Sequence, residues 1–129
     1  MFGFGKKKED PNRKALRQEF ESVTSALRAA DATAQIAVGH AINMANSLFH
    51  KSFSGVNGFQ DLPKSERISY INKLTDMENS LKAKGDMPAS LGFGLFKMWV
   101  GAAAELDAQL MNQFSKELAY FSEKGDISP

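Results

Sequence analysis

Apolar side chains recur along the first half of the chain at alternating steps of four and three residues. The series runs from Leu16 to Leu48 without an intervening proline. Steps that average 3.5 residues place all these side chains on one side of a helix, as in left-handed bundles. Asp10 and Pro11 supply a capping acceptor and a residue suited to a first helical turn. The pattern therefore predicts one long helix over residues 11–51. Its apolar seam comprises Leu16, Phe20, Val23, Leu27, Ala30, Ala34, Ala37, Ala41, Met44 and Leu48.

Two further helices are predicted after a cluster of helix-breaking residues at 54–58. Apolar residues at helical spacing indicate a second helix over residues 63–84, which Gly85 ends as a left-handed cap. The same spacing indicates a third helix over residues 88–123. No segment shows the alternating β-branched pattern of a strand. The predicted fold class is an all-α bundle of three helices, two long and one shorter.

A chain of 129 residues is long enough for one domain that buries its own core. We expect residues 11–124 to form this helical domain. Residues 1–10 are predicted to be a flexible leader with aromatic and basic side chains, and residues 125–129 a C-terminal tail.

The predicted second helix is too short to cover the whole seam of the first. Even an antiparallel third helix leaves one side of the N-terminal half of the seam open, and the sequence does not decide between the parallel and antiparallel courses. An exposed apolar stripe of this kind favours self-association, most often across a two-fold axis. The sequence therefore predicts a homodimer that completes the bundle through Leu16, Phe20, Val23 and Leu27.

A second candidate interface is the polar side of the predicted first helix. Residues 32–50 contain no Asp, Glu, Lys or Arg. Opposite the apolar seam, His40, Asn43, Ser47 and His50 fall in one sector at 100° per residue. Polar groups without charges are typical of a face whose hydrogen bonds are satisfied by a partner. The alternatives are a neutral exposed face, hydrogen bonds within the monomer, or a pocket for a small ligand.

Few residues are suited to catalysis or to binding a metal. Cysteine is absent, which excludes disulfides, thiolate metal sites and cysteine nucleophiles. His40 and His50 would lie about 15 Å apart on one helix, too far to share an ion. The Gly92–Gly94 segment has neither the further glycines nor the preceding strand of a nucleotide-binding loop. We therefore expect a protein that is not an enzyme and uses no metal or cofactor.

The first eight residues combine two aromatic rings with a lysine cluster. Phe2 and Phe4 can insert into an apolar surface, while Lys6, Lys7 and Lys8 are attracted to anionic lipid by about 1 kcal/mol each. The same lysines would give only salt-sensitive, nonspecific contacts with phosphates, so no specific nucleic-acid partner is predicted. A weak contact with a membrane surface is the functional interpretation, and a frayed leader is the alternative.

The leading hypothesis is a non-catalytic helical interaction module, such as an adaptor, inhibitor or immunity-type protein, that binds an unidentified protein through helix–helix contacts. One alternative is a peripheral protein of an anionic membrane or apolar surface, using residues 1–8 and the amphipathic helices. The other is a small-ligand binder on the polar face of the first helix. No stretch is apolar enough for a membrane span or a secretory signal. We expect a cytoplasmic location, with or without contact to the inner face of a membrane.

Overall fold

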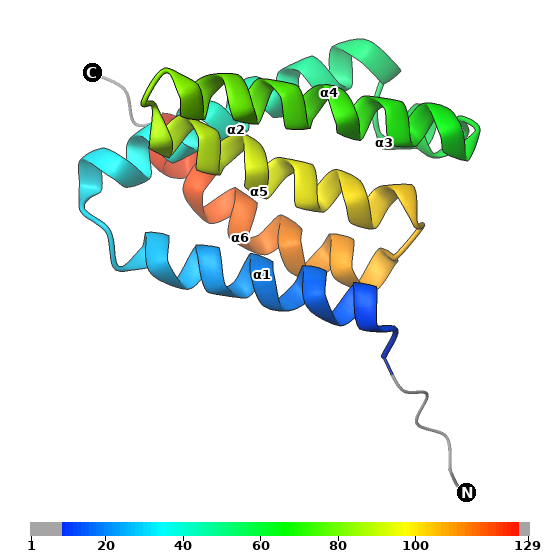
Figure 1. The fold of residues 1–129 in the computed structure, drawn as a ribbon, viewed down its shortest axis with the longest axis horizontal. Helices are drawn as coiled ribbons and strands as arrows, with labels where there is room; N and C mark the ends of the chain where they lie inside the picture. Colours follow the sequence, from blue (N-terminus) through cyan, green and yellow to red (C-terminus); the bar gives the residue numbers. More distant parts are fainter. Residues whose placement is uncertain (1–8, 127–129) are drawn as a thin grey trace, which may run out of the picture.

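Six helices make up residues 9–126, the part of the chain that the computed structural model describes, and no strand occurs among these residues (Figure 1). The predicted all-α class is confirmed. The division into three helices is wrong, because the first and the third predicted helices are each interrupted. The six helices are α1 (Pro11–Arg28), α2 (Ala32–Phe53), α3 (Val56–Gln60), α4 (Lys64–Ala83), α5 (Met87–Ala104) and α6 (Ala108–Asp126).

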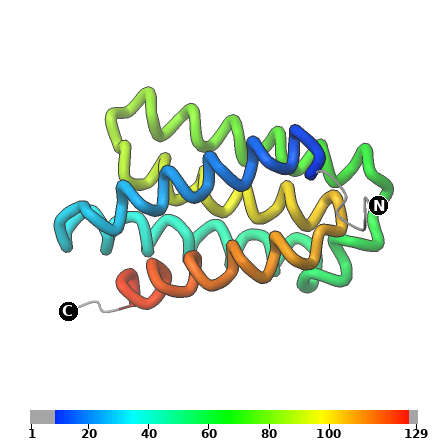
Figure 2. The backbone as a smooth tube through the Cα atoms, turned by 90° about the horizontal axis from the view of Figure 1, so that it is seen from below, coloured from blue at the N-terminus to red at the C-terminus, as the bar shows by residue number. Residues whose placement is uncertain are grey.

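Helix α5 lies at the centre of the bundle. Most of its residues are buried, including Leu95, Trp99 and Val100. A helix that is apolar on all sides is one that other helices surround. Figure 2 shows α5 in yellow, with α4 in green on one side and α2 in cyan and α6 in orange on the other. Helix α1 also packs against α5. Helix α5 therefore contacts each of the other four long helices, α1, α2, α4 and α6.

The first interruption falls at residues 29–31, between α1 and α2. The Asp31 side chain caps α2 by accepting a hydrogen bond from a backbone N–H in its first turn, at 2.9 Å. The buried Gln35 amide donates to the carbonyl oxygens of Leu27 and Arg28 at 3.0 and 3.1 Å. The last carbonyls of a helix have no partner inside it, so Gln35 satisfies the end of α1. The chain can therefore reverse here, and α2 runs back along the bundle in the direction opposite to α1 (Figure 1).

We expect Gln35→Leu to lower the free energy of unfolding by about 1–3 kcal/mol, because buried carbonyls at the end of α1 would lose their donor. Urea titration measures this change. Gln18→Leu, at an exposed position of α1, is the matched control and should leave the transition midpoint unchanged. An equal midpoint for the two variants would contradict the capping role of Gln35.

The second interruption separates α5 from α6. Leu106 adopts a left-handed φ of 58°, and its N–H donates to the carbonyl of Ala103 at 3.1 Å. The N–H of Asp107 donates to the carbonyl of Ala102 at 2.9 Å. This pair of bonds is the Schellman pattern that ends many helices. Gly85, with a φ of 83°, occupies the same position after α4, so the predicted left-handed cap there is confirmed.

We expect Leu106→Gly to keep or raise the melting temperature. Leu106 is 59% exposed, so its side chain contributes little packing. A left-handed L-residue costs about 1–2 kcal/mol, which exceeds the roughly 0.5–1 kcal/mol that glycine loses through its greater freedom when unfolded. Ile68→Gly, inside α4 and 44% exposed, is the control and should lower the free energy of unfolding by about 1 kcal/mol. Equal losses in the two variants would show that Leu106 is not strained.

The apolar seam that was predicted to stay open in the monomer is closed within the chain. Phe20 is 1% exposed and its ring stacks on that of Phe114, with the centroids 3.9 Å apart. Leu27 is also buried, and Leu16 and Val23 pack against the core while partly buried. The N-terminal part of the first predicted helix and the C-terminal part of the third cover each other, because both predicted helices fold back at their interruptions. The geometric reason for a homodimer at this seam is therefore removed.

The buried side of α2 is shifted by one residue from the predicted seam. Met44 and Leu48, expected to face inward, are 59% and 38% exposed. The interruption between α1 and α2 resets the helical phase, so the steps counted along α1 do not carry through. Ala41 is buried as predicted, and the other residues of α2 that face the core are Gln35, Val38, Gly39, Ile42, Ala45 and Phe49.

Helices α2 and α6 cross with their backbones in contact. A Cβ atom built on Gly39 would lie 2.1 Å from the carbonyl oxygen of Phe121, and one on Gly125 would lie 2.5 Å from the carbonyl carbon of Gly39. Only residues without a side chain permit this approach. Gly125 lies inside α6, which continues to Asp126 and so passes the predicted end of the domain at residue 124.

Candidate interaction surface

The outward side of α2 carries no charge along most of its length and exposes two large apolar side chains among neutral polar ones. Met44 and Leu48 project from it, and no charged residue occurs between positions 32 and 50. Three smaller or neutral side chains share the same sector of the helix, within about 100° of its circumference. We call this set the α2 face; it consists of Ala37, His40, Met44, Ser47 and Leu48.

A groove of about 310 Å³ runs beside the α2 face, on the side of α4. Buried Phe93 lines it from α5, and Leu81 lines it from α4. Asp86, the residue that caps α5, is the one charged group in its lining and lies at the turn between α4 and α5. The groove is therefore apolar with a single acidic end. Its complete lining is Ala37, His40, Ala41, Met44, Leu81, Asp86, Ala89 and Phe93.

A smaller cleft of about 200 Å³ lies between α2 and α6. Four polar residues of its lining, Asn43, Trp99, Ser115 and Ser122, make hydrogen bonds within the chain, and the exposed Asn46 and His50 also line it. The Asn43 side-chain amide donates to the carbonyl of Ser122 at 3.2 Å and to the Asp126 carboxylate at 3.1 Å. The Trp99 indole N–H donates to the Ser115 hydroxyl at 3.0 Å. These bonds join α2 and α5 to α6 inside the monomer.

The four predicted polar-face residues do not form one site. His40 lines the groove beside α4, whereas Asn43 and His50 line the cleft beside α6, and Ser47 is exposed between the two. Asn43 follows the alternative of hydrogen bonding within the monomer. The predicted membrane contact over residues 1–8 lies outside the described part of the chain.

A cleft of about 560 Å³ lies among the ends of α1, α4, α5 and α6, and half of the residues that line it are charged. Two ion pairs cross it, with Arg13 Nε 2.6 Å from Asp107 Oδ2 and Lys64 Nζ 3.6 Å from Glu105 Oε2. The hydrogen bond from Arg13 lowers the pKa of Asp107 below its ordinary value, despite partial desolvation. Asp107 also caps α6 through the N–H of Leu110, at 3.0 Å. These charges therefore hold helix ends together within the chain.

Comparison with protein-family models, with curated proteins and with solved structures found no match for this chain. Among residues 9–126, none of the helices has the length and apolar character needed to cross a membrane. The same residues include no group of three or more His, Cys, Asp or Glu side chains placed to hold a metal ion.

Proposed function

We propose that this chain is a non-catalytic helical interaction module that binds a protein partner through the α2 face. The observation that carries the proposal is the exposure of Met44 and Leu48 on a helix without charge from 32 to 50. Protein interfaces have centres depleted of charge and enriched in methionine and aromatic residues. The two exposed side chains lie beside a groove that Leu81 and Phe93 line, which adds apolar contact area to this uncharged surface.

The shape of the surface favours a protein over a small ligand. Small-molecule pockets usually enclose about 300–1,000 Å³. The groove beside α4 measures about 310 Å³ and the cleft beside α6 about 200 Å³, so the two lie at or below the lower end of that range. Depressions of this size on both sides of a projecting helix match single side chains inserted by a partner. Asn43 and Trp99 in the cleft already bond within the chain, while the exposed Asn46 and His50 of its lining offer a protein partner polar contacts.

The test is affinity capture from the native host with wild type, Met44→Lys and a matched control. Ile68→Lys introduces the same charge at another exposed apolar position, on α4 and outside the α2 face. We expect a protein that wild type and Ile68→Lys retain and that Met44→Lys loses. Circular dichroism spectra should show the same helix content for both variants, because both positions are exposed. Identical sets of retained proteins would contradict the proposal.

A further inference from the structure

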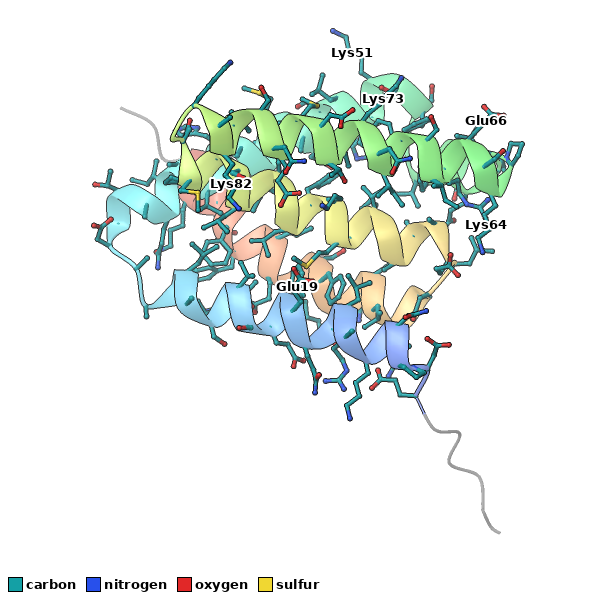
Figure 3. All side chains as sticks on the ribbon, in the orientation of Figure 1. Glu19, Lys51, Lys64, Glu66, Lys73 and Lys82 are labelled. Atoms are coloured by element: carbon teal, nitrogen blue, oxygen red, sulfur yellow. The ribbon has the colours of Figure 1, made fainter. Side chains whose placement is uncertain are left out.

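The α2 face has the spacing by which one helix packs along another. Ala37, His40, Met44, Ser47 and Lys51 follow one another at steps of three and four. Met44 projects at the centre of this series, and the small side chains of Ala37 and Ser47 on either side of it allow a second helix to come close. Lys51 is the first charged residue after the face and points away from the bundle (Figure 3).

The surface carries opposite charges at its two ends. Lys51 lies at the C-terminal end of α2, about 21 Å along the helix from Ala37. Beside Ala37, the groove is lined by the exposed carboxylate of Asp86. The Lys51 ammonium is therefore the charged group at one end, the Asp86 carboxylate is the charged group in the groove lining at the other, and the middle is uncharged. The exposed Lys82 and Lys84 precede Asp86 outside this lining. A surface of this kind is complementary to itself when it is turned end to end.

We propose that the partner of the α2 face is a second copy of this chain, docked antiparallel across a two-fold axis through Met44. The inference rests on the proposed function and names the partner. In this arrangement each Met44 meets its counterpart beside the groove, and each His40 lies opposite Leu48 of the second copy. Each Lys51 reaches the Asp86 end of the other groove, so the same ion pair forms twice.

The charges select the antiparallel arrangement over the parallel one. A parallel pairing would bring the two Lys51 ammonium groups together and would leave both Asp86 carboxylates without a cation from the other copy. Like charges placed opposite one another disfavour an interface. The flexible thioether of Met44 suits a groove lined by Leu81 and Phe93, because methionine adapts to irregular apolar surfaces.

Sedimentation of the full chain tests the self-association. We expect wild type and Ile68→Lys to have twice the 14.2 kDa mass of the chain, and Met44→Lys to have the mass of one chain, because two lysines would meet on the axis. A wild type that stays at the mass of one chain at millimolar concentration overturns the inference. So does a Met44→Lys variant that still dimerises. In the first case the capture experiment stands independently, because it detects partners other than this chain.

Cysteine cross-linking tests the axis and the direction of packing. The chain contains no cysteine, so each substitution introduces the only thiol. Mild oxidation should link Met44→Cys into covalent dimers. Lys51→Cys should not cross-link, because antiparallel packing keeps its two copies about 21 Å apart along the helices. Ile68→Cys controls for random collision. Cross-linking of Lys51→Cys at the rate of Met44→Cys would overturn the antiparallel arrangement.

Charge substitution tests the pairing of Lys51 with Asp86. Lys51→Glu should raise the dimer dissociation constant about tenfold at low salt, because two ion pairs become two repulsions. Adding Asp86→Asn in the same chain should recover about half of the lost binding free energy, because it removes the repulsion without restoring the ion pair, and asparagine keeps the cap of α5. The difference should shrink at high salt. A double variant that dimerises no better than Lys51→Glu alone would overturn the proposed register.

Discussion

Gly39→Ala is expected to lower the free energy of unfolding by about 2–3 kcal/mol, although alanine is the better helix former. The added methyl group would lie 2.1 Å from the carbonyl oxygen of Phe121 and 2.5 Å from the backbone nitrogen of Gly125. Both obstacles are backbone atoms of α6, so no side-chain rotation can relieve the overlap. The two helices must move apart, and this disturbs the core between them.

Gly101→Ala is the matched control, because Gly101 also lies inside a helix, at α5. Its added Cβ would have Leu16 Cδ2 as its nearest neighbour, at 4.0 Å, which is ordinary contact. We expect this variant to gain about 0.5–1 kcal/mol from the reduced freedom of the unfolded chain. Urea unfolding of both variants separates helix propensity from the crossing. A Gly39→Ala protein as stable as Gly101→Ala would show that α2 and α6 do not cross at these glycines.

The sequence predicts the helical class and several helix ends, because those ends carry local signals. Asp10 caps α1 by accepting from the N–H of Asn12 at 2.7 Å, and Gly85 takes the left-handed position after α4. The end of α5 uses the same geometry with Leu106 in place of glycine. Leucine gives no signal for a left-handed residue, since it disfavours that conformation. The long third helix was therefore predicted without its interruption.

The candidate surface was misplaced for a related reason. Between Ala30 and Ala41 the predicted seam consisted of alanines, which fit a buried or an exposed position equally well. The predicted helical phase therefore continues that of residues 16–27 and places Met44 inside the bundle. The larger residues Val38, Ile42 and Phe49 carry the signal for the true phase, because their burial stabilises more than that of alanine. The spacing of Val38, Ile42 and Phe49 predicts a helical phase in which Met44 and Leu48 face solvent.

Phe20→Ala is expected to lower the free energy of unfolding by about 3–5 kcal/mol and to leave the association state unchanged. The Phe20 ring is enclosed by the bundle and lies nearly parallel to that of Phe114, at an interplanar angle of 13°. The exposed ion pair between Arg28 and Glu117, at 2.9 Å, also joins α1 to α6. A surface pair of this kind contributes at most about 1 kcal/mol, so it cannot replace the stacked rings.

Phe20→Ala is expected to affect folding, and Met44→Lys is expected to affect association. Comparing the two variants therefore separates the stability of the monomer from the assembly of the dimer. Phe20→Ala should shift the urea midpoint strongly at every protein concentration, whereas Met44→Lys should change the sedimented mass and leave the midpoint unchanged when it is measured below the dimer dissociation constant. Phe20→Leu refills part of the cavity and should recover part of the lost stability. A Phe20→Ala protein with an unchanged midpoint and a lower mass would return the interface to the seam of α1. Because the ring is already covered by Phe114 within one chain, the structure predicts a loss of folding instead.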